Sequence, residues 1–212
     1  MRFIHASDLH IDSPLRGLDR YDGAPVDRLR SATRSALERL VDRALTERVD
    51  FLLLAGDIYD RDWQDFHTGL FFRGQMVRLE RAGIRCFIVQ GNHDAQGVIS
   101  RQLTLPSNVT VFSSRAAQTI RLDDLSVAIH GRSFPEREVN EDLVPSYPPP
   151  VPGFFNIGLL HTSLTGRAGH DTYAPTDLPT LVAKGYDYWA LGHVHAREVL
   201  NERPRIVFCG NL

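Results

Sequence analysis

The sequence predicts an α/β fold, and three observations support this class. Short apolar runs alternate with longer segments of helical periodicity, which is typical of helices layered on a sheet. The run from Phe51 to Ala55 is apolar at every position, as expected for a strand buried on both faces of a parallel sheet. Asp, Asn or His residues follow five of the apolar runs directly, which is typical of functional loops at the carboxyl edge of such a sheet.

The expected elements follow in order along the chain. The expected strands cover residues 3–6, 51–55, 86–89, 109–112, 119–122, 126–130, 156–160, 188–191 and 205–209, and the expected helices cover about 26–49, 64–82 and 176–185. From residue 109 onward the strands are shorter, and we expect them to be more antiparallel. Residues 135–153 hold six prolines and predict a surface loop. Because the chain shows no internal repeat and no linker, we expect one domain over residues 1–212.

Composition excludes several classes of protein. The 212 residues carry a formal net charge of -2, which argues against a protein that grips DNA by bulk electrostatics alone. The chain has no apolar run near 18 residues, so we expect no membrane span, and its first residues lack a secretory signal. Cys86 and Cys209 lie far apart and do not suggest a disulfide framework, although a bond between them stays an open alternative. We therefore expect a reducing, cytoplasmic location.

Five of the predicted strands end in side chains that bind metals. The segments that follow them are Ser7-Asp8-Leu9-His10, Gly56-Asp57-Ile58-Tyr59-Asp60, Gly91-Asn92-His93-Asp94, His161 and Gly192-His193-Val194-His195. Oxygen and nitrogen donors without a thiolate suit manganese, iron or zinc in expanded coordination. Two divalent ions beside Asp8 and Asp57 would leave a charge of about +2, which suits a phosphate substrate.

Backbone geometry is expected to direct these side chains toward one site. If the chain is extended at Asp8-Leu9-His10 and His193-Val194-His195, side chains two residues apart point the same way and one segment offers two ligands. The glycines before Asp57, Asn92 and His193 are expected to let the backbone turn sharply as it leaves the sheet.

Single members of the set have ordinary explanations. A lone histidine at a strand end is usually structural, and Gly-Asp or Gly-Asn pairs are common in turns. The ordered set, rather than any one residue, predicts the metal site. We expect structural roles for four other histidines, namely His5, His67, His130 and His170, and for both cysteines. For Asp60, a loop-holding role and a contact that supports the site remain equal alternatives.

The ordered set resembles the calcineurin-like metallophosphoesterases. Its surroundings resemble the SbcD branch of DNA repair exonucleases. Three segments carry this second resemblance: His5 to Pro14, Gly56 to Asp60 and Asp187 to His195. Within the branch, the chain most resembles the YhaO-type members, in Asp12-Ser13-Pro14 and in Phe208 to Leu212. The resemblance implies a four-layer α/β/β/α sandwich with mixed sheets and two divalent metal ions, with manganese as the usual activating metal.

The resemblance also implies a role for each residue of the set. It places Asp8, His10 and His195 at one metal and Asn92, His161 and His193 at the other, with Asp57 bridging both. It implies that His93 is not a metal ligand but faces the scissile phosphate and stabilises or protonates the leaving oxygen. It implies that Asp94 orients the His93 ring. All these residues are present, which argues against a catalytically silent scaffold. The expected activity is a two-metal phosphodiesterase that acts on DNA as an exonuclease or endonuclease in repair. The alternative is a phosphoesterase acting on nucleotides or other small phosphodiesters.

The resemblance further implies partners outside this chain. Family members normally carry a smaller capping domain after this point and work with an SbcC-like ABC ATPase. Since the sequence stops directly after an apolar strand, we expect it to be a piece of a longer protein without that cap. The helix over 64–82 carries more apolar side chains than one face needs, which predicts a homodimer, with plain core packing as the alternative.

Overall fold

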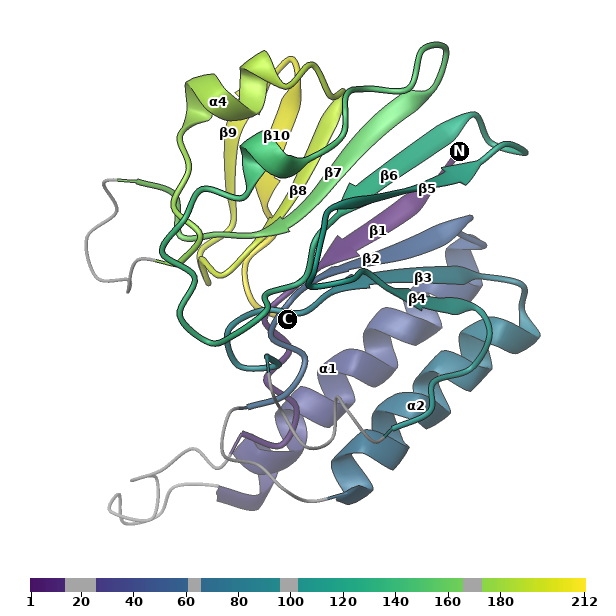
Figure 1. Ribbon diagram of the computed structural model, residues 1–212. Helices are drawn as coiled ribbons and strands as arrows, with labels where there is room; N and C mark the ends of the chain where they lie inside the picture. Colours follow the sequence, from purple (N-terminus) through teal and green to yellow (C-terminus); the bar gives the residue numbers. More distant parts are fainter. Residues whose placement is uncertain (14–25, 61–65, 96–102, 166–172) are drawn as a thin grey trace.

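Two β-sheets lie face to face at the centre of the computed structural model, and helices cover the outer face of the first (Figure 1). The structure describes residues 1–13, 26–60, 66–95, 103–165 and 173–212, and it describes the side chains of the first helix from residue 31 onward. Among these residues one sheet has four strands and the other has six.

The first sheet is entirely parallel. Its strands lie in the order β1 (Phe3–Ala6), β2 (Phe51–Ala55), β3 (Arg85–Val89) and β4 (Val109–Val111). Helices α1 (Val26–Glu47) and α2 (Phe66–Arg81) pack on its outer face. The carboxyl ends of β1, β2 and β3 therefore meet at one edge of the sheet.

The second sheet is mixed. Its strands are β5 (Gln118–Leu122), β6 (Val127–Gly131), β7 (Phe155–His161), β8 (Tyr188–Gly192), β10 (Arg205–Phe208) and β9 (Glu198–Glu202), in that spatial order. The pairs β6–β7, β7–β8 and β8–β10 are parallel, and only the outermost pairs, β5–β6 and β9–β10, are antiparallel. The strands after residue 109 were expected to be more antiparallel, and both antiparallel pairs among the described residues do lie in this part of the chain. The central pairs are nevertheless parallel, because long connections carry the chain back between these strands.

A continuous apolar core joins the two sheets. Alternate residues of β2 point to opposite faces: Leu52 and Leu54 pack against the helices, whereas Phe51 and Leu53 pack against the second sheet. The same alternation explains why the strand reads as one unbroken apolar run. Opposite them, the second sheet contributes Val127, Ile129, Ile157, Leu159 and Ala190. Together with the outer layers this arrangement is the four-layer α/β/β/α sandwich, so the expected fold class is confirmed.

The outer layer on the second sheet is thin. It contains the short helix α4 (Leu178–Ala183), capped by Asp177 as its sequence predicts, and the proline-rich segment with its 3₁₀ turn at Val144–Ser146. The expected surface loop over 135–153 is therefore corrected in part. Tyr147 is buried in it and donates a hydrogen bond to the Leu159 carbonyl at 2.8 Å, so this segment covers the sheet.

Two of the histidines expected to be structural, His5 and His130, have contacts that fit this role. His5 lies between the sheets and hydrogen-bonds the Tyr188 hydroxyl and the Leu191 carbonyl, each at 3.2 Å. Burial lowers the pKa of His5 to about 4, so its ring is neutral at physiological pH. His130 is buried and stacks on Tyr186. His67 is exposed on α2, and His170 lies outside the described residues.

Two further expectations concern a disulfide bond and a membrane span. Cys86 and Cys209 are both free thiols, so the open alternative of a disulfide between them was wrong. Both cysteines were interpreted as small buried residues: Cys86 is buried under the helices, whereas Cys209 is only half-buried. Within the described ranges, the structure contains no helix with the length and apolar character needed to cross a membrane.

Candidate metal centre

The five predicted strand ends meet at one edge of the sandwich. The loops after β1, β2 and β3 approach from the first sheet, and those after β7 and β8 approach from the second. A cavity of about 540 Å³ opens between them. The residues that line it include Asp8, His10, Asp57, His93, His193 and His195. Residues more than 180 positions apart in the sequence are thus brought to one site.

Glycines permit the close approach of these loops. A Cβ atom at Gly192 would lie 1.9 Å from the Ala55 carbonyl oxygen, and one at Gly91 would lie 2.4 Å from Asp57 Oδ1. Only Gly56 uses a positive φ, of 92°. The expectation that all three glycines serve sharp turns is therefore corrected: two of them are needed for space rather than for their backbone angles.

The loop after β1 is not extended, contrary to the expectation for Asp8-Leu9-His10. Asp8, His10 and Asp12 all have positive φ values, of 53°, 41° and 59°. Backbone hydrogen bonds to the loop after β2 stabilise this unusual path, including Asp8 N to Gly56 O at 3.0 Å and His10 N to Asp57 O at 3.1 Å. Alternate left-handed residues, rather than strand geometry, turn both side chains into the cavity. His193, at a φ of 99°, departs from an extended conformation too.

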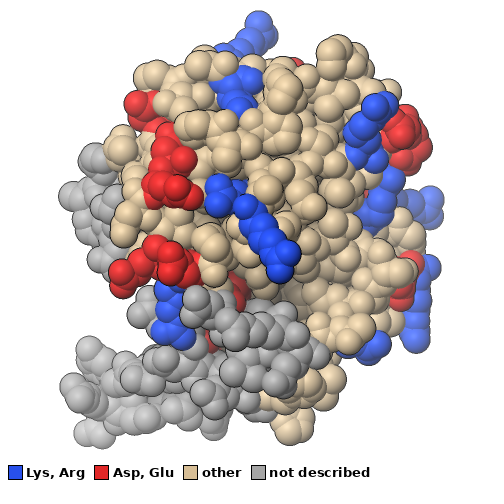
Figure 2. Space-filling model, viewed as in Figure 1, with Lys and Arg blue, Asp and Glu red and all other residues tan. Residues whose placement is uncertain are grey.

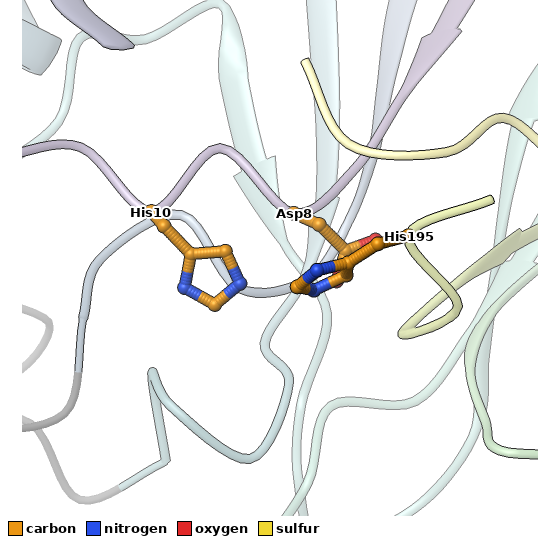
Figure 3. A group of neighbouring side chains, drawn as sticks. All are labelled: Asp8, His10 and His195. Carbon is orange, nitrogen blue, oxygen red and sulfur yellow. The ribbon is translucent and has the colours of Figure 1, made fainter. Parts of the chain in front are cut away.

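One group of donors contains Asp8, His10 and His195. One ligand atom from each lies within 4.8 Å of the others, and His195 Nε2 is 3.8 Å from Asp8 Oδ1. Asp8 and His10 come from the loop after β1, and His195 reaches them from the loop after β8 (Figure 3). Asp8 is buried and accepts hydrogen bonds from the Ser7 hydroxyl and the His193 backbone, whereas the His195 side chain is 52% exposed. This group therefore lies at the solvent side of the site.

A second group contains Asp57, His161 and His193, whose ligand atoms also lie within 4.8 Å of one another. Asn92 belongs beside them, because its Oδ1 is 3.0 Å from His161 Nε2. His161 Nδ1 donates to the Ala55 carbonyl at 2.8 Å, which directs Nε2 toward Asn92 and Asp57. A histidine held in this way through one nitrogen presents the other as a metal ligand.

Asp57, a member of the second group, also approaches the first group. Its Oδ2 is 3.9 Å from His10 Nε2 and 3.4 Å from His161 Nε2. Burial would raise the pKa of Asp57, but the adjacent His161 outweighs it and holds this pKa well below its usual range. Burial would likewise lower the pKa of His161, yet the Asp57 charge raises it to about 9. The two side chains thus sit in a strongly polar pocket in which a bound cation would replace the histidine proton.

The donor set fits divalent cations. His10 Nε2 is buried, and it has no hydrogen-bond partner among the residues that the structure describes. Such a nitrogen costs free energy unless something binds it. Around it lie carboxylate, imidazole and amide donors from separate loops, a mixture that suits manganese, iron or zinc. All seven residues expected as ligands are gathered in these two groups.

His93 lies at the mouth of the same cavity, but its partner differs from the one expected. Its Nδ1 is 3.0 Å from Asp60 Oδ1, and its backbone N–H donates to Asp57 Oδ1 at 3.0 Å. Asp94 is buried and accepts hydrogen bonds from the backbone of Ile58, Tyr59 and Gly91. The contact that orients the His93 ring was predicted for Asp94 but is made by Asp60. The sequence had left two alternatives for Asp60, a loop-holding role and a contact that supports the site. The pattern Gly56-Asp57-x-x-Asp60 was the available signal.

Asp94 has a different place in the site. Its bonds join the loop after β2 to the loop after β3, which carry Asp57 and Asn92. Burial, with the nearby Asp57 charge, raises the pKa of Asp94 to about 7 even though its backbone hydrogen bonds act in the opposite direction. Asp94 therefore fixes the spacing of ligand loops and does not line the cavity that holds the ligand groups.

Comparison with known proteins agrees with this geometry. The model of the calcineurin-like phosphoesterase family matches residues 1–197. The chain belongs to this family. A solved Thermus thermophilus protein, TT1561, has the same fold as this phosphoesterase, with a TM-score of 0.51, 14% identity and 84% of each chain covered.

The sequence also matches individual curated proteins within and near this family. It is 37% identical over 215 residues to the uncharacterized metallophosphoesterase YhaO of Bacillus subtilis, a match that covers 100% of this chain and 53% of YhaO. It is 23% identical to one subunit of the Escherichia coli nuclease SbcCD, with 100% and 60% covered. It is 24% identical to the Methanopyrus kandleri DNA double-strand break repair protein Mre11, with 92% and 44% covered. The chain thus spans about half the length of these relatives, and the predicted resemblance is confirmed.

A small substitution at Gly91 is expected to disable the metal centre of the phosphoesterase without unfolding it. In Gly91→Ala the new methyl group would lie 2.4 Å from Asp57 Oδ1 and 2.8 Å from His161 Nε2, so both side chains must move. We expect manganese to bind at least about tenfold more weakly, as when residues supporting a metal ligand are altered. Isothermal titration calorimetry measures this change.

The matched control is Gly74→Ala on α2, where a Cβ meets nothing within 4 Å. We expect this variant to bind manganese normally and to be stabilised by about 0.5–1 kcal/mol, because alanine replaces glycine inside a helix. Unchanged manganese affinity in Gly91→Ala would show that this glycine does not shape the site.

Proposed function

We propose that this phosphoesterase is a metal-dependent phosphodiesterase that cuts DNA, acting as an exonuclease or endonuclease in DNA repair. The observation that carries the proposal is the convergence of the two donor groups on Asp57, with His93 at the same cavity. This arrangement offers places for two cations and one phosphate side by side. The separate loops that supply the donors are fixed by buried hydrogen bonds, so the site is preorganised.

We assign Asp8, His10 and His195 to one divalent ion and Asn92, His161 and His193 to the other, with Asp57 shared. Manganese is the ion we propose, since the mixed oxygen and nitrogen donors without a thiolate suit it and the family resemblance implies it as the usual activating metal. Bound divalent cations supply two kinds of chemistry here: they lower the pKa of water toward neutrality and neutralise charge on the phosphate. The protein's own contribution is to hold the donors at a fixed spacing and to place His93 beside them.

His93 is the residue we assign to the leaving oxygen. Because Nδ1 faces the Asp60 carboxylate, Nε2 is the ring atom that would give its proton to the departing alkoxide. Asp60 stabilises the protonated ring and fixes its orientation. Asp94, which the sequence placed next to this step, acts at a distance by holding the two ligand loops together.

Two observations bear on the substrate. The names of the relatives, a nuclease subunit and a DNA double-strand break repair protein, support DNA. The charge of the chain is less favourable, because its net value is -2 and basic and acidic side chains are interspersed on the face shown in Figure 2. This second observation favours an alternative function, hydrolysis of nucleotides or other small phosphodiesters that need no extended basic surface.

A manganese-dependent assay separates the two functions. Labelled linear DNA, single-stranded and double-stranded, is incubated beside bis-p-nitrophenyl phosphate, with and without chelator. Our proposal expects manganese-dependent cleavage of both DNA and the small diester. Cleavage of the small diester alone would favour the alternative, and failure to cleave any phosphodiester would refute the proposal.

Partners are part of the proposal as well. Phe66 and Leu70 on α2 are 44% and 50% exposed, while Phe72 and Met76 on the same helix are buried. The extra apolar face supports a homodimer through α2, which light scattering can test: a monomer at high concentration would contradict it. The association with an SbcC-like ABC ATPase, supported by the naming of a relative as a subunit, can be tested by co-purification of the full-length proteins.

A further inference from the structure

We propose that Ser13 is a positioning residue that acts through Asp60 on His93, an inference that rests on the proposed function. The Ser13 hydroxyl donates to Asp60 Oδ2 at 2.6 Å, and Asp60 Oδ1 is 3.0 Å from His93 Nδ1. Each oxygen of the Asp60 carboxylate therefore has a separate partner. Hydrogen bonds of a hydroxyl to a carboxylate at this distance are among the stronger ones in proteins.

The second bond matters because one contact does not fix a carboxylate. A carboxylate held only through Oδ1 can still rotate about its terminal torsion, which is broad in aspartate. The Ser13 bond restricts this rotation and so helps to set the direction in which Oδ1 meets the His93 ring. A small error in the position of a group that transfers a proton lowers the reaction rate strongly.

The residue before Ser13 explains how the hydroxyl is held in place. Asp12 accepts a two-pronged contact from Arg34 of α1, at 2.7 and 2.6 Å, and a hydrogen bond from the Thr68 hydroxyl of α2 at 2.5 Å. Its backbone N–H donates to Thr33 Oγ1 at 3.1 Å. These contacts stabilise the left-handed backbone of Asp12, which has a φ of 59°.

The helices of the outer layer thus fix the position of Ser13. Ser13 N donates to the His10 carbonyl at 3.0 Å, which sets the distance between Ser13 and a metal-ligand residue. The sequence Asp12-Ser13 then has two separate tasks: the aspartate anchors the loop to both helices, and the serine restrains Asp60. Pro14, the third member of the motif, lies outside the described residues.

A double-mutant cycle tests the proposal. We expect Ser13→Ala to lower kcat on DNA on the order of tenfold, the usual scale for residues that support a functional side chain, with KM and manganese content unchanged. Ser13→Thr keeps the hydroxyl and should restore most of the rate. In an Asp60→Asn background, Ser13→Ala should have no further effect, because the path through Asp60 is already broken.

The control is Ser107→Ala. Ser107 donates to Glu80 at 2.8 Å, the same kind of hydroxyl–carboxylate bond, but it precedes β4 at the opposite end of the sheet. We expect no change in kcat. An additive loss of kcat in the double variant would overturn the proposal. So would a rise in KM without a fall in kcat, because Ser13 also lines the cavity and would then be contacting substrate directly.

A second readout does not depend on activity. In protein labelled with ¹⁵N-histidine, the ring signals of His93 are assigned from their loss in His93→Gln. We expect Ser13→Ala to shift them and Ser13→Thr and Ser107→Ala to leave them in place. Unshifted His93 signals in Ser13→Ala would overturn the positioning role, whatever the activity of the wild-type protein. A wild-type protein that hydrolyses no phosphodiester would separately refute the proposed function.

Discussion

Asp57→Ala is expected to lose both metal ions and nearly all turnover. Asp57 Oδ2 lies near a ring nitrogen of a histidine in each donor group, at 3.9 Å from His10 and 3.4 Å from His161, so its removal weakens both groups together. Bound divalent metals would contribute several kcal/mol of transition-state stabilisation, so we expect kcat to fall on the order of 10³-fold or more. Elemental analysis of the dialysed protein gives the metal content beside the rate.

The control for Asp57 is another aspartate in an ion pair. Asp124 is exposed, and its carboxylate pairs with Arg85 at 3.0 Å. Asp124→Ala should keep both metals and full activity, because surface ion pairs contribute about 1 kcal/mol or less to stability. Two manganese ions per chain in Asp57→Ala would contradict the shared position of this side chain.

His93→Ala is expected to keep both metals but lose turnover. The His93 ring contacts Asp60 and is not among the seven residues to which we assign the two ions, so its loss should leave manganese affinity unchanged. General acid catalysis contributes about 10²–10⁴-fold, and we expect a loss in this range on DNA. His67→Ala, which alters an exposed histidine on α2, is the control and should be fully active.

The leaving group gives a sharper test of the same residue. A DNA strand leaves as an alkoxide that needs a proton, whereas p-nitrophenolate departs readily without one. We therefore expect His93→Ala to lose far less activity on bis-p-nitrophenyl phosphate than on DNA. Equal losses on the two substrates would argue that His93 binds the phosphate and does not donate a proton.

The sequence predicted the fold where hydrophobic pattern and layer position agree. β2 reads as apolar throughout because its two faces meet two different layers, and this pattern is visible without a structure. β9 (Glu198–Glu202) was missed because it is a polar edge strand with half-buried residues and no apolar run. The expectation of more antiparallel pairing after residue 109 holds for the outer pairs of the second sheet, but the parallel central pairs could not be foreseen, since strand length does not distinguish a hairpin from a crossover.

The members of the site were easier to predict than their contacts. Ligand-type residues after five strands identified the metal groups, because strand ends of this topology converge. The direction of each side chain depends on local backbone angles, such as the left-handed conformations of Asp8 and His10, which the residue types do not reveal. The same limit applies to the partner of His93: the resemblance implied Asp94, but the turn directs the Asp94 side chain to the backbone of the loop after β2, and Asp60 makes the contact.

The most direct test is anomalous diffraction from crystals soaked in manganese. We predict two peaks, one among Asp8, His10 and His195 and one among Asn92, His161 and His193, with Asp57 touching both. A single peak, or none at these side chains, would contradict the two-metal centre.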